Sequence, residues 1–130
     1  WADQSVVPLN VIDYYELVER TMGGRAQTQD FFRLFMVPGM NHCRGGAGAD
    51  AIDYIGSIEA WVEQGKAPDM MLGHRVTPAA EAKYRATNYA FPLPAGEVAF
   101  TRPHFPYPMQ YRYGGSGADT DAANYGAVTP

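Results

Sequence analysis

The sequence has one cysteine, Cys43, among its 130 residues, so no disulfide can form within the chain. It has no run of Lys or Arg, and its formal net charge is −4, which argues against a nucleic-acid partner. No apolar run approaches the roughly 20 residues that a membrane-spanning helix needs. We therefore expect no nucleic acid and no membrane as partners, and Cys43 is either a free thiol or half of a bridge to another segment.

The sequence also lacks an initiator methionine and begins at Trp1. Nothing before Val11 resembles the apolar core of a signal peptide, so the start predicts a processed or excised piece. The length fits one domain, and a hydrophobic content of 46% argues against disorder. The 14 glycines and 10 prolines predict many loops.

The first half of the chain has the hydrophobic pattern of an α/β protein. Residues Pro8–Thr21 are predicted to form a helix, because its apolar residues recur at three- and four-residue steps and Gly23-Gly24 follow it. Residues 31–37, FFRLFMV, predict a strand buried on both faces, with Arg33 pairing or reaching solvent at its edge. A second helix is expected after Asp50 as its cap, with its apolar stripe at Ile52, Ile55, Ile58, Trp61 and Val62 and its end at Gly65.

The second half of the chain is less regular. Residues 70–77 and 97–101 predict short strands, and the alternation of helix, strand and helix is typical of an α/β sheet with crossover helices. Trp61 and the methionines are expected in the core. From residue 103 the aromatic, Pro and Gly composition predicts a tail that straps over the surface of the segment 1–102 and does not form a domain of its own.

A glycine-rich loop, MVPGMNHCRGG, places His42 beside Cys43 between the predicted strand and the next helix. The stretch 46–51, GAGADA, imitates a dinucleotide-binding fingerprint, but eight residues separate it from the strand and Asp50 would repel phosphate. A metal site is a weak hypothesis, because no ligand spacing organises the candidate residues, which are His42, Cys43, His74 and His104. We predict no cofactor and no metal, and expect His74 and His104 to be structural or exposed.

The third hypothesis for the loop is acid–base catalysis. Asp3 lies in a loop-like stretch before the first helix, and that helix leads to the strand that delivers His42. The order of acid loop, helix, strand and His loop is typical of the closing section of an α/β-hydrolase. A surface histidine and an Asp3 that caps the helix would give the same pattern, so spacing alone leaves both interpretations open.

Four segments carry a resemblance to a known family: WADQSVVPLNVIDYY, FRLFMVPGMNHCRGG, AIDYIGSIEAWVEQGKAPDMM and TRPHFPYPMQYRYGGSGADTDAANY. Together they resemble the C-terminal part of the tannase and feruloyl esterase family, which are serine esterases of the α/β-hydrolase class. The resemblance implies that Asp3 is the triad acid and His42 the triad base. It also implies that Cys43 is bridged to a cysteine beside the catalytic serine, in an upstream part of the same enzyme.

The resemblance further implies galloyl- or feruloyl-type aromatic esters as substrates and a secreted or periplasmic protein. The sequence departs from the family in two respects. None of its serines, Ser5, Ser57 and Ser116, lies in G-x-S-x-G, so we expect the nucleophile upstream and this chain alone to be inactive. The tail lacks the family's cysteines, so we expect packing to hold it, through Phe105, Tyr107, Tyr111 and Tyr113.

The sequence is also compatible with two further interpretations, a binding domain and a homo-oligomer. The aromatic tail also permits a non-catalytic domain that binds carbohydrate or phenols through stacked rings. A homo-oligomer that covers an exposed sheet edge is equally compatible with the sequence.

Overall fold

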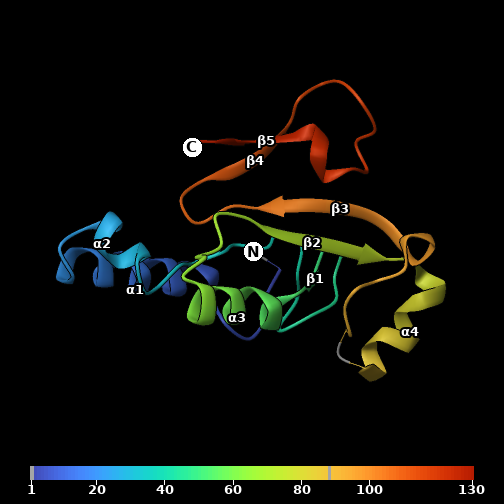
Figure 1. Ribbon diagram of the computed structural model, residues 1–130, viewed down its shortest axis with the longest axis horizontal. Helices are drawn as coiled ribbons and strands as arrows, with labels where there is room; N and C mark the ends of the chain where they lie inside the picture. The colour runs from blue at the N-terminus through green and yellow to red at the C-terminus, as the bar shows by residue number, and fades with distance from the viewer. Residues whose placement is uncertain (1, 88) are drawn as a thin grey trace.

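The computed structural model describes residues 2–87 and 89–130, so Trp1 of the first family-like segment lies outside the described residues. A three-stranded sheet in the order β1-β2-β3 forms the centre of the molecule, and a separate two-stranded hairpin, β4–β5, lies beyond β3 (Figure 1). The strands are β1 (Ala51–Ile52), β2 (Met71–Val76), β3 (Val98–His104), β4 (Gln110–Tyr113) and β5 (Tyr125–Val128). The chain is thus of mixed α/β content.

Four α-helices and two short 3-10 helices complete the described part of the chain. They are α1 (Pro8–Thr21), α2 (Arg25–Gln29), α3 (Tyr54–Gln64), α4 (Pro78–Thr87), η1 (Ala95–Glu97) and η2 (Ala122–Asn124). In Figure 1, α1 and α2 lie at one end of the sheet and α4 at the other. None of the helices in the described ranges combines the length and the apolarity that crossing a bilayer requires.

The central sheet is antiparallel throughout its described length. Ala51 pairs with His74, and β2 pairs with β3 from Met71 opposite His104 to Val76 opposite Val98. The strands predicted at 70–77 and 97–101 are confirmed. The crossover arrangement that the alternating pattern predicted is absent from the described residues, because α3 connects two antiparallel neighbours and not two parallel ones.

The prediction of a buried strand at residues 31–37 is wrong. The segment forms one isolated bridge, Phe35 with Pro106, and the Tyr107 N–H donates to the Leu34 carbonyl at 2.8 Å. Its side chains are half-buried or, for Phe31, exposed. An apolar run becomes a central strand only where neighbours pair along both of its edges, and within the described residues one short contact is available to it.

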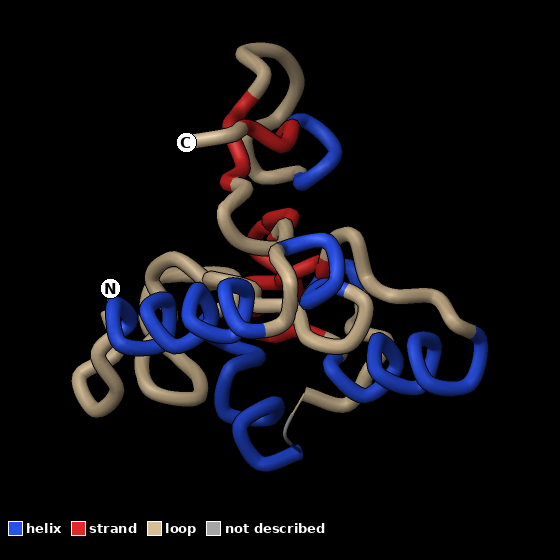
Figure 2. The backbone as a smooth tube through the Cα atoms, turned by 90° about the vertical axis from the view of Figure 1, so that its left-hand side faces the viewer, coloured by secondary structure: helices blue, strands red, loops and turns tan. Residues whose placement is uncertain are grey.

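The tail is more regular than its composition predicted. β4 and β5 pair antiparallel from Gln110 opposite Val128 to Tyr113 opposite Tyr125, and Figure 2 shows this hairpin standing off the rest of the chain. Thr101 of β3 fastens it, since its N–H donates to Thr120 O at 2.9 Å and its hydroxyl accepts from Ala122 N at 2.8 Å. The Arg102 guanidinium adds a second attachment, because it lies 4.5 Å from the centroid of the Tyr125 ring.

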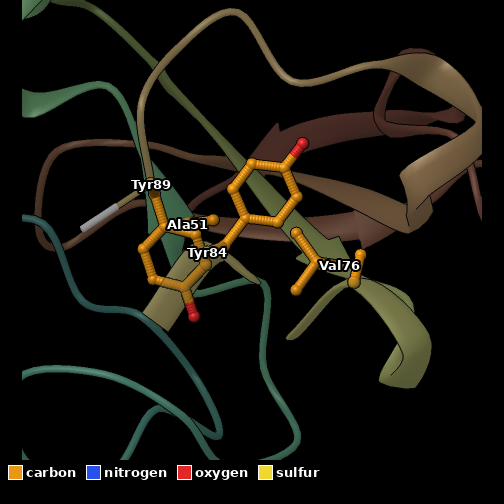
Figure 3. Packing of buried hydrophobic residues seen from close by; sticks show 5 residues of the cluster. Ala51, Val76, Tyr84 and Tyr89 are labelled. Carbon is orange, nitrogen blue, oxygen red and sulfur yellow. The ribbon is translucent and has the colours of Figure 1, made fainter. Parts of the chain in front are cut away.

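The expectation that Trp61 and the methionines form the core is also wrong. The compact buried cluster comprises Ala51, Val76, Ala80, Tyr84 and Tyr89, which come from β1, β2, α4 and the segment after α4 (Figure 3). The rings of Tyr84 and Tyr89 stack at 6.2 Å. Trp61 is half-buried beneath the Arg33 guanidinium, and each of the six methionines is half-buried or exposed. The core therefore forms at the α4 end of the sheet.

A second, smaller packing centre lies around Tyr15 of α1, which is fully buried. Its ring meets Phe32 edge-on at 5.1 Å and Tyr107 at 6.1 Å, so it joins the helix to two segments that are distant in sequence. The buried Glu19 carboxylate accepts two hydrogen bonds from Arg25, at 2.7 and 3.1 Å. These contacts set the position of α1, and with it the position of the residues just before the helix.

Candidate active site

The predicted acid, Asp3, lies in a turn that precedes α1. One carboxylate oxygen, Oδ1, accepts the backbone N–H groups of Ser5 at 2.8 Å and Val6 at 2.9 Å. Asp3 therefore shapes the turn itself and does not cap α1, whose first residues have no side-chain cap. This arrangement holds the carboxylate in one orientation and leaves Oδ2 available for a second partner.

That second partner is His42. Its Nδ1 lies 3.1 Å from Asp3 Oδ2, so the structure brings the two residues together as predicted for an acid and a base. A carboxylate accepts hydrogen bonds and does not donate them, so Nδ1 carries the proton and Nε2 is left as the basic nitrogen. The His42 side chain is 50% exposed and that of Asp3 23% exposed, so the ring borders solvent.

The Asp3 carboxyl is acidic because of its backbone partners. The backbone N–H groups of Val6 and Ser5 are the main cause that lowers its pKa from 3.8 to about 2, and the hydrogen bond and charge of His42 are smaller causes in the same direction. Asp3 is therefore ionised at neutral pH.

His42 sits at the tip of a loop that closes on itself. Asn41 N donates to Gly45 O at 3.0 Å, and Met40 forms an isolated bridge with Gly46. Below the tip, the N–H groups of Ala47 and Gly48 both reach Gly39 O, at 2.9 and 3.1 Å. These bonds hold the two legs of the loop together without a regular strand.

Two glycines make this closure possible. A Cβ at Gly46 would meet the Gly39 carbonyl oxygen, and a Cβ at Gly48 would meet the Pro38 carbonyl oxygen. Gly46 also has a φ of +92°, which side chains rarely adopt. The glycines that resembled a dinucleotide fingerprint therefore serve close backbone contact within the His42 loop.

The Asp50 side chain joins the His42 loop to the rest of the fold, a role that the sequence did not predict. It was expected to cap the second helix, but Asp53 is the cap and accepts Gly56 N at 2.9 Å. The Asp50 side chain is instead fully buried, where it accepts the Gly45 N–H and the Tyr89 hydroxyl, the latter at 3.2 Å. Arg75 of β2 completes the anchor at 3.3 Å from the Asp50 carboxylate.

The remaining candidates are Cys43, His74 and His104. Cys43 is a free, exposed thiol with a φ of 65°, beside His42 in the loop. His74 Nδ1 lies 3.2 Å from the Ala51 carbonyl oxygen, and His104 Nε2 lies 3.1 Å from the Ala49 carbonyl oxygen. Each of the two histidines thus has a backbone carbonyl as its partner, and the described residues contain no cluster of three side chains suited to a metal ion. In the part of the chain that is described, no serine hydroxyl is hydrogen-bonded to His42.

Comparison with protein families identifies the chain. A family model described as "Tannase and feruloyl esterase" matches residues 1–128. The chain belongs to the tannase and feruloyl esterase family. Among curated relatives in this family, a mono(2-hydroxyethyl) terephthalate hydrolase from Piscinibacter sakaiensis is 40% identical over 129 residues, and a probable feruloyl esterase from Arthroderma benhamiae is 34% identical over 125 residues.

These matches cover 99% and 95% of this chain but 19% and 20% of the relatives, so the chain spans about a fifth of their length. Among solved structures, an esterase from Aspergillus oryzae aligns over 97% of this chain and 25% of its own, with a TM-score of 0.78 and 29% identity. Feruloyl esterase B from Aspergillus oryzae aligns over the same fractions, with a TM-score of 0.76 and 26% identity. The aligned quarter of each of these two esterases therefore has the same mixed α/β fold as this chain.

Proposed function

We propose that this chain supplies the acid and the base of a serine carboxylic-ester hydrolase, with Asp3 and His42 as two members of its triad. The observation that carries the proposal is the 3.1 Å contact between Asp3 Oδ2 and His42 Nδ1, made by a carboxylate whose other oxygen is already held by backbone. Such a carboxylate fixes the tautomer of the ring and stabilises the imidazolium that forms during catalysis.

The mechanism follows from the nitrogen that is left free. His42 Nε2 accepts the proton of a serine hydroxyl as that oxygen attacks the ester carbonyl, and then returns the proton to the departing alcohol. Water, activated in the same way, releases the acid from the acyl-enzyme. The serine and the donors of the oxyanion hole belong, in this proposal, to an upstream part of the same enzyme with an α/β-hydrolase fold.

The surface of α3 supports the proposal that further protein packs on this chain. No residue of this helix is buried, and its apolar stripe is exposed at Ile55, Ile58 and Val62. Amphipathic helices normally bury such a stripe, and exposed apolar patches commonly mark interaction surfaces. We propose that the rest of the enzyme covers it.

The proposed substrates are esters of aromatic acids. The relatives are named as a hydrolase of a terephthalate monoester and as feruloyl esterases, and both names refer to esters of an acid that contains an aromatic ring. A purely binding function of the aromatic tail is less well supported, because its rings pack on one another. Tyr125, for example, meets Tyr111 edge-on at 5.7 Å and Tyr113 at 5.4 Å.

The proposal is tested in the intact enzyme with methyl ferulate as substrate. We expect His42→Ala to remove nearly all turnover and Asp3→Asn to lower kcat by about 10³- to 10⁴-fold, because the amide favours the wrong tautomer. His74→Ala is the matched control, since His74 also bonds through Nδ1 but faces a backbone carbonyl, and it should keep kcat within about threefold. Turnover that survives in His42→Ala would disprove the assignment.

We propose that Cys43 is bridged, in the intact enzyme, to a cysteine near the nucleophile, which would tether the loop beside the serine. The thiol is free and exposed in this chain, so a partner could reach it. We expect Cys43 of the folded intact enzyme to resist iodoacetamide until reductant is added, as measured by mass spectrometry of the labelled peptide. Immediate alkylation without reductant would contradict the bridge, and with it the proposed secreted or periplasmic location.

A further inference from the structure

The short stretch that leads from the His42 loop into β1 is held by side chains from other parts of the chain. Asp50, at its end, binds the Gly45 N–H of the loop. Ala49, one residue earlier, is 1% exposed and precedes the paired residues of β1. Its carbonyl accepts a hydrogen bond from His104 at the end of β3, whose Nε2 lies 3.1 Å away. The stretch is therefore fastened to the far strand of the central sheet as well as to the loop.

The bond between β3 and this stretch depends on a glycine of the strand between them. The imidazole of His104 reaches past β2 at Gly73. A Cβ at Gly73 would lie 2.3 Å from His104 Nε2 and 2.4 Å from the Ala49 carbonyl oxygen. Any side chain at this position of β2 would therefore separate the donor from its acceptor.

The state of the His104 ring suits this one bond. A carbonyl only accepts, so Nε2 carries the ring proton. Burial lowers the pKa of His104, so the ring is neutral at neutral pH. Its Nδ1 is buried and has no partner among the described residues, and the Tyr111 ring packs against the imidazole at 5.9 Å. An apolar side chain would fill this space without leaving a buried acceptor unpaired, so the bond to Ala49 is what a histidine adds here.

We propose that His104 is a positioning residue for His42 and acts through the Ala49 carbonyl. The N–H of Gly48, the preceding residue, donates to the other leg of the loop at 3.1 Å, so the position of Ala49 affects both legs. Without the bond from His104, the loop keeps its internal hydrogen bonds but is free to shift as a unit relative to Asp3. The inference rests on the proposed function, because it concerns the base of the same triad.

The test compares His104→Leu, which removes the donor, with His104→Gln, whose side-chain amide can donate to the same carbonyl. Both are made in the intact enzyme and assayed with methyl ferulate. We expect His104→Leu to lower kcat about 10- to 100-fold with KM within about twofold, because a displaced base slows the chemical step and leaves substrate binding intact. His104→Gln should recover most of the lost kcat. His74→Leu is the matched control and should keep kcat within about threefold, since its partner, the Ala51 carbonyl, belongs to β1 itself.

Hydrogen exchange, followed by mass spectrometry of the intact enzyme, separates this inference from the proposed function. Peptides that cover residues 39–48 should exchange faster in His104→Leu and at nearly the normal rate in His104→Gln, with no change in α4. This result reports the bond to Ala49 whether or not His42 is the base, and a failure of the proposed function appears separately as turnover in His42→Ala. Equal losses in the two His104 variants would overturn the inference. So would a His104→Leu enzyme whose kcat or loop exchange is normal.

A measurement on the unaltered enzyme keeps the inference falsifiable if His104→Leu does not fold. In enzyme labelled with ¹⁵N-histidine, the His104 ring should carry its proton on Nε2, and that proton should exchange slowly with solvent because the ring is buried and hydrogen-bonded. A proton on Nδ1 would mean that the ring does not donate to Ala49, which would overturn the inference.

Discussion

The two carboxylate oxygens of Asp3 have different roles, one in the backbone turn and the other in the contact with His42. Oδ1 closes the turn through Ser5 and Val6, and Oδ2 contacts the ring of His42. Because the backbone N–H groups are the larger cause of its low pKa, the carboxylate keeps its charge whether or not His42 is protonated. The orientation and the charge that a triad acid needs are thus set locally, within four residues of chain.

The first prediction follows from this pKa. Asp3 should titrate with a midpoint of about 2 when its carboxyl ¹³C resonance is followed against pH, below the ordinary 3.8. In His42→Ala the midpoint should rise but stay below 3.8, because the two backbone hydrogen bonds remain. The stabilisation from this group is present above pH 3.8 and is lost as the pH falls towards 2. An ordinary midpoint in the unaltered protein would contradict the hydrogen-bonded turn.

At the scale of single residues, the pairing of Asp3 with His42 was predicted but its supports were not. The order of loops, helix and apolar run left a non-catalytic interpretation open, and the family resemblance assigned the two residues as acid and base. Two of the partners of Asp50, Arg75 and Tyr89, lie 25 and 39 residues away, on β2 and after α4, so its position before a helix suggested a cap instead. The unsatisfied nitrogen of His104 depends on a carbonyl 55 residues away and has no signal in the sequence.

Among the structural elements, the His42 loop behaves as a small unit with its own anchor. The backbone bonds between its legs define its shape, and the Asp50 carboxylate fixes that shape to the core through Gly45. Arg75 keeps the buried carboxylate paired through Nη1, and Glu81 Oε2 lies 3.6 Å from its other terminal nitrogen, Nη2. Asp50 is therefore a positioning residue for His42.

Asp50→Ala is expected to lower the free energy of unfolding by about 3 kcal/mol, because it leaves the Gly45 N–H and the Tyr89 hydroxyl without their buried acceptor. It should also speed amide hydrogen exchange at Gly45, measured by NMR. Asp53→Ala is the matched control three residues away, since it removes only the cap of α3 and should cost about 1 kcal/mol without changing exchange in the loop. Equal effects of the two changes on Gly45 would show that Asp50 does not hold the loop.

The sequence predicted well those elements whose apolar spacing and end residues lie within the element or next to it in the chain. α1 and α3 have apolar steps and glycine ends, and α3 ends at Gly65 in the left-handed conformation as expected. β2 and β3 were predicted because each pairs with the other within the chain. The run at residues 31–37 has the composition of a central strand, but pairing and not composition decides whether a strand forms.

At the scale of the whole molecule, two groups of apolar side chains face outward. Leu9, Tyr14 and Leu17 of α1 are more than half exposed, and so are Ile55 and Val62 of α3. The chain spans about a fifth of the relatives that it matches. These exposed faces and the missing nucleophile have the same explanation in the proposed function, which is a surface shared with the rest of an esterase.

The 130-residue chain alone is accordingly expected to hydrolyse no ester. A base without its hydroxyl and oxyanion donors loses most of the effect of a triad, because its members act as a unit. Ser116 is the serine with glycines on both sides, and it lies exposed in the loop between β4 and β5. We expect no burst of nitrophenol from a nitrophenyl ester and no labelling by a fluorophosphonate. Stoichiometric labelling of Ser116 would mean that this chain is a complete small hydrolase.

The two glycines that let the His42 loop close have a genetic consequence. Every glycine codon becomes an alanine codon by one base change, so the loop is one nucleotide away from a methyl group that its backbone cannot accommodate at Gly46 or Gly48. The same change at Gly96 or Gly126 meets no atom within 4 Å. The codons of Gly46 and Gly48 therefore tolerate fewer neutral alleles than the codons of Gly96 and Gly126, which have open space around them.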